Sequence, residues 1–156
     1  MFFSQRNGHL MTDVVGREPI TSICFSKDGQ CVLVNSSGGS TIKLFDKSSG
    51  ELLQEFHGHS HKGDYRIEAI LDETDQNVLA GSEDGNVYVW SLVEATLLTK
   101  LNHIRTATEN EDSRSNSRNL VIASLAFHPS ASYLCSAAKG WVYHWGPKHD
   151  LDEELN

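Results

Sequence analysis

Short runs of alternating apolar and polar residues cover most of this chain. Each run is rich in Val, Ile, Leu and aromatic residues and is bounded by Gly, Asp or Ser, which is typical of strands joined by tight turns. The pattern predicts a first group of strands at 20–26, 30–35, 41–46 and 51–57, and a second group at 66–71, 77–82, 86–91 and 96–101. Because short turns join consecutive strands, each group is expected to form an antiparallel meander. The predicted fold class is therefore all-β.

The strand pattern repeats along the chain. Residues 34–46 align with 79–91 at an offset of 45, and residues 79–90 align with 134–145 at an offset of 55. The additional residues fall at 102–119, a run of Thr, Asn, Glu, Asp, Ser and Arg that is typical of a flexible loop. A period of about 40 to 45 residues that carries four strands is typical of a β-propeller blade. The sequence therefore predicts a partial propeller of about three four-stranded antiparallel blades.

The repeat divides the chain into segments. Residues 1–18 end in an alternating run at 8–15, which we interpret as the fourth strand of an incomplete blade. The remaining segments are a first blade at 19–59, a second blade at 60–101, a polar flexible insertion at 102–119, a third, three-stranded blade at 120–146 and an acidic tail at 147–156. Since propellers typically close with about 4 to 8 blades, the chain is predicted to be part of a longer ring and to expose apolar blade faces.

The second blade carries a distinctive set of polar and aromatic residues. Gly58 and His59 precede it, residues 82–85 (Ser-Glu-Asp-Gly) form its tight turn, and Trp90 closes its third strand. This unit strongly resembles a WD repeat. The resemblance implies a buried structural hydrogen-bond chain made of His59, Ser82, Asp84 and Trp90. In that chain the imidazole lies between the turn carboxylate and the hydroxyl, and the indole N–H is the last donor.

The other two blades depart from this pattern. The first has Phe45 in place of the Trp and Gly39 in place of the turn Asp, so it is predicted to lack the chain. The third keeps Trp145 but has Lys139 in place of the turn Asp. Pro147 is expected to end its strand ladder before a fourth strand forms.

A wider resemblance covers residues 6–145. It rests on the words FSKDGQC at 25–31, GELL at 50–53 and SEDGNVYVWSLVEA at 82–95, which are similar to the mitogen-activated protein kinase organizer family. The resemblance implies a fragment of a seven-bladed, non-enzymatic scaffold. It also implies protein partners, namely kinase-cascade components and the pre-mRNA splicing machinery, in the cytoplasm and the nucleus. The N-terminal half of the family pattern is absent here, and the insertion is longer than the family's connection.

Charge and composition bear on the class of partner. The chain has 13 Lys and Arg against 21 Asp and Glu, a net charge of −8, and no basic cluster, so direct nucleic-acid binding is not expected. Its apolar runs are far shorter than the roughly 18 residues of a spanning helix, so no membrane contact is expected. Cys24, Cys31 and Cys135 lie in apolar stretches and are expected to be reduced, as in an intracellular protein. No cofactor is expected, whereas self-association through the exposed blade faces is.

A run of histidines leaves an enzymatic alternative open. His57, His59 and His61 alternate, and on a strand they would present three imidazoles on one face, as in a zinc triad. The alternative function is a zinc-dependent or hydrolytic enzyme that uses this run. Against it, the Gly-His position already accounts for His59, the run lies at a boundary between strand and loop, and no Gly-x-Ser-x-Gly elbow occurs. A further alternative is a truncated propeller without independent function.

The polar insertion offers candidate phosphorylation sites. Ser113, Ser115 and Ser117 lie beside Arg114 and Arg118, so phosphate would exchange local positive charge for negative charge. The alternative is an unmodified, solvated loop.

Overall fold

The structure is a computed structural model that describes residues 2–3, 10–11, 15–103, 120–128 and 132–147. These residues form thirteen strands, and no helix among them is long and apolar enough to cross a membrane. The greater part of the strand predicted at 8–15, of the insertion at 102–119 and of the tail at 147–156 lies outside the described residues.

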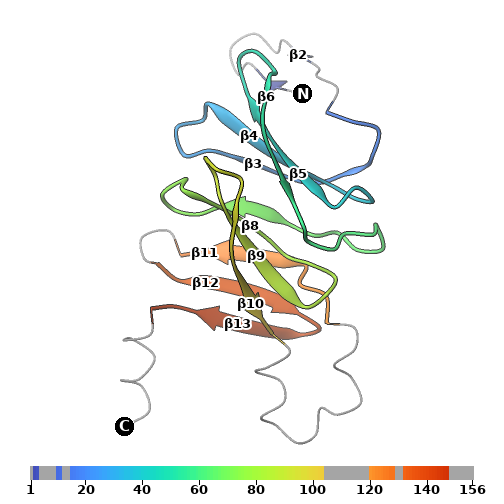
Figure 1. Cartoon of the computed structure of the whole chain (residues 1–156), viewed down its shortest axis with the longest axis vertical. Coiled ribbons are helices and arrows are strands. Elements are labelled where there is room, and N and C mark those ends of the chain that lie inside the picture. Colours follow the sequence, from blue (N-terminus) through green and yellow to red (C-terminus); the bar gives the residue numbers. More distant parts are fainter. Residues whose placement is uncertain (1, 4–9, 12–14, 104–119, 129–131, 148–156) are drawn as a thin grey trace, which may run out of the picture.

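Three antiparallel sheets follow one another along the long axis of the molecule (Figure 1). The first consists of β3 (Ile20–Phe25), β4 (Cys31–Ser36), β5 (Thr41–Asp46) and β6 (Leu52–His57). The second consists of β7 (Ala69–Leu71), β8 (Asn77–Ala80), β9 (Asn86–Ser91) and β10 (Leu97–Asn102). The third consists of β11 (Ser124–Phe127), β12 (Leu134–Ala138) and β13 (Trp141–Trp145). In every sheet the strands lie in chain order, so the predicted all-β fold of antiparallel meanders is confirmed.

Two further strands near the N-terminus form a separate pair. β1 (Phe2–Phe3) and β2 (Leu10–Met11) are antiparallel and pair only with each other among the described strands. β2 lies within the run predicted as a strand, whereas β1 was not predicted. Its two residues are too short a segment to show an alternating pattern.

The strand ends show where neighbouring sheets are joined. Strands β5 and β9 coincide with the predicted ranges 41–46 and 86–91, whereas β7 begins later than the predicted residue 66. The backbone just before β7 bonds to the first sheet instead, because the Ile67 carbonyl accepts hydrogen bonds from Thr21 Oγ1 at 3.1 Å and Asn35 Nδ2 at 3.0 Å. The start of the second meander is therefore used to connect two sheets.

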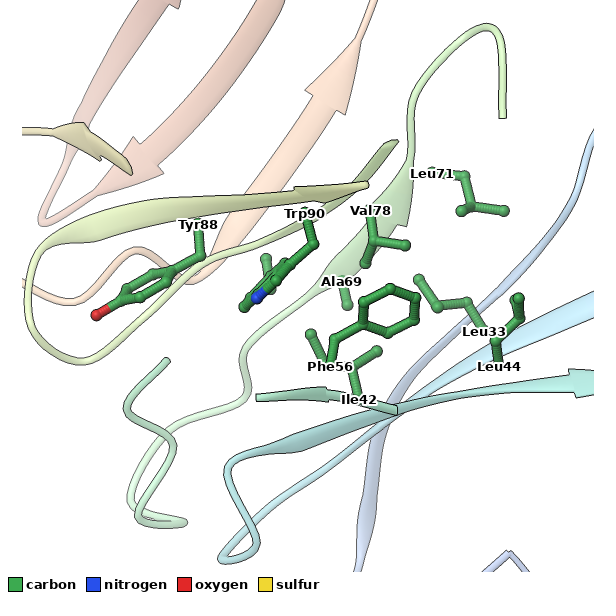
Figure 2. Close-up of a cluster of buried hydrophobic side chains, with 10 residues drawn as sticks. Leu33, Ile42, Leu44, Phe56, Ala69, Leu71, Val78, Tyr88 and Trp90 are labelled. Carbon is green, nitrogen blue, oxygen red and sulfur yellow. The ribbon is translucent and has the colours of Figure 1, made fainter. Parts of the chain in front are cut away.

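Two hydrophobic cores fill the spaces between the sheets. The first lies between the first and second sheets and includes Leu33, Ile42, Phe56 and Trp90, all at most 1% exposed (Figure 2). The second lies between the second and third sheets and includes Leu79, Val87, Ile122, Leu125 and Leu134. Each fully buried Leu, Ile or Phe side chain contributes about 2 kcal/mol relative to exposure. The stacking of the sheets is therefore driven mainly by apolar burial.

Alternation along the strands allows the second sheet to serve both cores. On β8, Val78 faces the first core and Leu79 faces the second. On β9, Tyr88 and Trp90 belong to the first core, and Val87 belongs to the second. Because successive side chains on a strand point to opposite faces, these runs are apolar on both faces.

The face of the first sheet that points away from the second sheet is partly exposed. Strand pairing places Ile23 opposite Val34 and, in the second sheet, Ala69 opposite Ala80, so Ile23 and Ala69 occupy matching positions. Ile23 is 65% exposed, whereas Ala69 is 2% exposed. Val32 and Val34 on the same face are buried, so the exposure lies on β3 and not on β4.

Candidate functional site

The strongest sequence motif centres on His59, which lies between β6 and β7. The side chain is 4% exposed and packs edge-on against Trp90, with ring centroids 5.8 Å apart, and against Tyr88 at 6.4 Å. Neither ring nitrogen of His59 has a hydrogen-bond partner. Among the described residues the imidazole is therefore held by aromatic packing and not by hydrogen bonds.

Ser82, Asp84 and Trp90 lie around the same corner but bond to other groups. Ser82 Oγ accepts a hydrogen bond from the Ser60 amide at 3.0 Å, and Asp84 Oδ2 accepts one from the Tyr88 hydroxyl at 2.7 Å. The indole N–H of Trp90 donates to the backbone carbonyl of His57 at 3.0 Å. The bonds to Ser60 and His57 tie the connection between the first two sheets to the second sheet, and the bond to Tyr88 holds the turn between β8 and β9. Both roles are structural.

The electrostatics of this corner keep His59 neutral. Burial, with a smaller contribution from neighbouring His61, lowers the pKa of His59 to about 4, although Asp84 opposes the shift. Burial and the hydrogen bond to Asp84 raise the pKa of Tyr88 to about 12. Burial alone would raise the pKa of Asp84, but the hydrogen bonds that its carboxylate accepts from Tyr88, Ser82 and Asn86 lower it overall.

A second buried histidine stands at the start of the third sheet. His103 is fully buried, and its Nε2 lies 2.6 Å from Ser136 Oγ, which also accepts a hydrogen bond from Trp145 Nε1 at 2.8 Å. The ring packs edge-on against Tyr143 and Trp145, with centroids 4.6 and 4.9 Å away. A serine hydroxyl that accepts from the indole is free to donate its own proton to a neutral imidazole. Burial lowers the pKa of His103, which favours that neutral form.

The repeat pattern of the sequence does not reveal this second arrangement. His103 falls within the predicted polar insertion, although it follows His59 by 44 positions, close to the 45-residue offset of the first two blades. The predicted offset of 55 residues also places Leu134 opposite Leu79 on the strand before the turn. Strand register instead makes Ser136 the counterpart of Ala80, because Ser136 pairs with Tyr143 as Ala80 pairs with Tyr88.

The two hairpins differ by one residue in the length of chain between matching pairs. Six residues separate Ser136 from its partner Tyr143, whereas seven separate Ala80 from its partner Tyr88. Between β12 and β13 only Lys139 and Gly140 intervene, both at positive φ (45° and 82°), which is the geometry of a two-residue hairpin. The β8–β9 turn takes residues 81–85. Aligning the turns by their glycines therefore shifts the preceding strand by one position and assigns its side chains to the wrong face.

The alternating histidines occupy three different environments. His57 is exposed, with Nδ1 3.3 Å from Thr41 Oγ1, whereas His61 is fully buried and its Nε2 lies 3.0 Å from the Tyr65 carbonyl oxygen. The centroids of the His59 and His61 rings are 6.2 Å apart. In the part of the chain that the structure describes, no group of three His, Cys, Asp or Glu side chains is placed to hold a metal ion. The candidate phosphorylation sites Ser113, Ser115 and Ser117 lie outside the described residues.

Comparisons with known proteins all find WD-repeat proteins. The family model described as "WD domain, G-beta repeat" matches residues 6–46 and 50–91. The chain is 43% identical over 139 residues to "WD repeat domain-containing protein 83" of Danio rerio, covering 89% of the chain and 39% of the relative. For the Homo sapiens protein of the same name, the identity is 41% over 143 residues, covering 92% and 40%.

A more distant relative shows the same pattern of coverage. The "WD repeat domain-containing protein 83 homolog" of Dictyostelium discoideum is 31% identical over 106 residues, covering 68% of the chain and 32% of the relative. The chain thus spans about 40% of the length of the vertebrate relatives described above. With two matched repeats and three stacked antiparallel sheets, the chain belongs to the WD domain, G-beta repeat family.

Proposed function

We propose that this chain is part of a non-enzymatic scaffold for protein–protein contacts. WD repeats generally mediate such contacts. The observation that carries the proposal is the way side chains hold the turns between strands. Asp46 Oδ1 accepts hydrogen bonds from the Ser48 and Ser49 amides, and Asp72 Oδ1 accepts them from the Thr74 and Gln76 amides. Turns that are already ordered lose little entropy when a partner binds.

The specific proposal is that the scaffold assembles kinase-cascade components, splicing factors, or both, in the cytoplasm and the nucleus. It is supported by the resemblance to the mitogen-activated protein kinase organizer family and by the relatives named above. A net charge of −8 favours contact with RNA through a protein partner and not directly.

The test is quantitative capture from cells that express the tagged chain. Mitogen-activated protein kinases and their activators are measured by mass spectrometry, and small nuclear RNAs by reverse transcription with and without nuclease treatment. A tagged WD-repeat fragment from an unrelated family, of similar length and charge, serves as control. Enrichment of either set over the control is expected. Recovery of both sets at the control level would reject the specific proposal.

The exposed part of the face of the first sheet that points away from the second sheet favours self-association as a further property. Ile23 is 65% exposed there, although its counterpart in the second sheet, Ala69, is buried. We expect light scattering to show dimers or larger species of the purified chain, with a cooperative thermal transition. A stable monomer would contradict self-association. Aggregation without a cooperative transition would favour the alternative of a truncated propeller without independent function.

A further inference from the structure

A cavity opens where the first strands of the three sheets end. It has a volume of about 220 Å³, and β3, the turn after β7 and the end of β11 all contribute to it. Its apolar walls include Phe25, Leu71 and Phe127. Small-molecule sites usually begin at roughly 300 Å³, so a cavity of this size fits one side chain better than a whole cofactor.

The polar side of the cavity is acidic. Asp72, Glu73 and Asp75 line it, together with a single lysine, Lys27. The Lys27 ammonium group donates to the backbone carbonyl of Glu73 at 3.3 Å, and no ion pair of Lys27 occurs among the described residues. At neutral pH the three carboxylates outnumber the one ammonium group, which makes the cavity attractive to a cation.

The three carboxylates are engaged by the protein to different extents. Asp72 accepts hydrogen bonds through both oxygens within its own turn, and Asp75 accepts one from the Lys27 amide through Oδ2 at 2.6 Å. Glu73 accepts one from Ser132 Oγ through Oε1 at 3.0 Å, and its Oε2 is the one carboxylate oxygen of the three that is buried without a partner among the described residues. A buried carboxylate oxygen without a donor is unfavourable, and an incoming N–H group would relieve it.

We propose that this cavity binds a lysine or arginine side chain of a protein partner, with its stem against Phe25 and Phe127 and its charged head at Glu73. The apolar walls match the methylene stem of such a side chain, and the acidic side matches its head. The proposal rests on the proposed scaffold function, because it names the chemistry of one partner contact.

The test uses the full chain and short blocked Gly/Ser peptides with one central residue. Arg and Lys peptides are compared with peptides that carry citrulline or Gln, and binding is followed by NMR titration of backbone amide signals. We expect the Arg and Lys peptides to bind about tenfold more tightly than the neutral ones and to shift the signals of residues around Phe25 and Phe127. Equal binding of Arg and citrulline peptides would overturn the proposal.

Two matched variants separate the cavity from general attraction to an acidic protein. Glu73→Gln keeps the shape of the side chain and removes one charge, and Glu51→Gln makes the same change at an exposed position that does not line the cavity. Glu73→Gln is expected to weaken Arg-peptide binding about tenfold and Glu51→Gln less than about twofold. An equal effect of the two variants would also overturn the proposal. Failure of the capture experiment with normal Arg-peptide binding would instead reject only the kinase and splicing partners.

Discussion

The second and third sheets begin with the same feature and support it differently. His59 and His103 are both buried beside a tryptophan and a tyrosine of the sheet that follows. In the third sheet Ser136 Oγ bonds both the imidazole and the indole, whereas in the second sheet Ala80 occupies the matching position and His59 has no partner.

One residue, at the register position of Ser136 and Ala80, therefore determines whether the buried histidine and tryptophan share a hydrogen-bond partner. A hydroxyl at this position satisfies two buried polar groups at once, and a methyl group satisfies neither. The second sheet compensates only in part, because Trp90 Nε1 reaches the His57 carbonyl. His59 therefore depends on packing with Trp90, Tyr88 and His61.

The largest effect is expected from separating the two sheets that are being compared. A Cβ at Gly81 would lie 2.0 Å from the Ile122 carbonyl oxygen, which is backbone and cannot rotate away. Gly81→Ala should therefore cost about 3 kcal/mol or more in free energy of unfolding, measured by urea denaturation. Gly39→Ala is the control, since no atom lies within 4 Å of its Cβ position and its φ is not left-handed. Equal stability of the two variants would show that Gly81 and the Ile122 carbonyl do not approach each other as closely as in the structure.

Acid should destabilise the chain through His59. Its pKa is about 4 in the folded chain against an ordinary value of 6.5, so the unfolded chain binds the proton first. Stability is then lost as the pH falls from about 6.5 towards about 4, by roughly 3 kcal/mol for this group. Urea midpoints across this range measure the loss. His103, whose pKa is also lowered, acts in the same direction, so His59→Gln should reduce the slope but not abolish it. An unchanged slope in this variant would contradict the assignment.

Removing the hydroxyl of the third sheet should make it resemble the second. Ser136→Ala leaves the His103 imidazole and the Trp145 indole without their shared partner, which should cost about 2 kcal/mol in unfolding free energy. A double-mutant cycle with Trp145→Phe should show that the two losses are coupled. Strictly additive losses would mean that Ser136 does not connect the two rings.

The reverse substitution should give the second sheet the missing partner. Ala80→Ser adds a hydroxyl at the position that Ser136 occupies in the third sheet, where Ser136 bonds the histidine His103, and His59, the matching histidine of the second sheet, has no partner. We expect a gain of about 1 kcal/mol in unfolding free energy near neutral pH. Ala138→Ser, on a buried position of the third sheet, is a control for adding a hydroxyl to a core. A loss of stability as large as in this control would show that the surroundings of His59 and His103 differ in more than the residue at the Ala80 and Ser136 position.

Much of the fold could be predicted from the sequence because local patterns determine it. The ranges of β5 and β9, the grouping of strands into sheets, and the importance of the Gly58–His59 corner all follow from alternation and turn residues. The predictions were wrong where a contact between residues far apart in the sequence sets the start of a strand or the surroundings of a side chain. β7 begins late because the backbone at Ile67 bonds to another sheet, and His103 was assigned to the insertion because its partner Ser136 is 33 residues away in the chain.

The sequence by itself determined the strands, their order and the family, because side-chain alternation and glycine turns act within a few residues. Only the tertiary structure decided which polar groups meet. In the tertiary structure Ser136 and Ala80 occupy matching register positions, and His59 has no hydrogen-bond partner. Glu73 lines a cavity to which three sheets contribute. These outcomes depend on strand register and on packing between sheets. A change of one residue in the length of a turn alters both the strand register and the packing between sheets. The local alternation of apolar and polar residues does not reveal such a change.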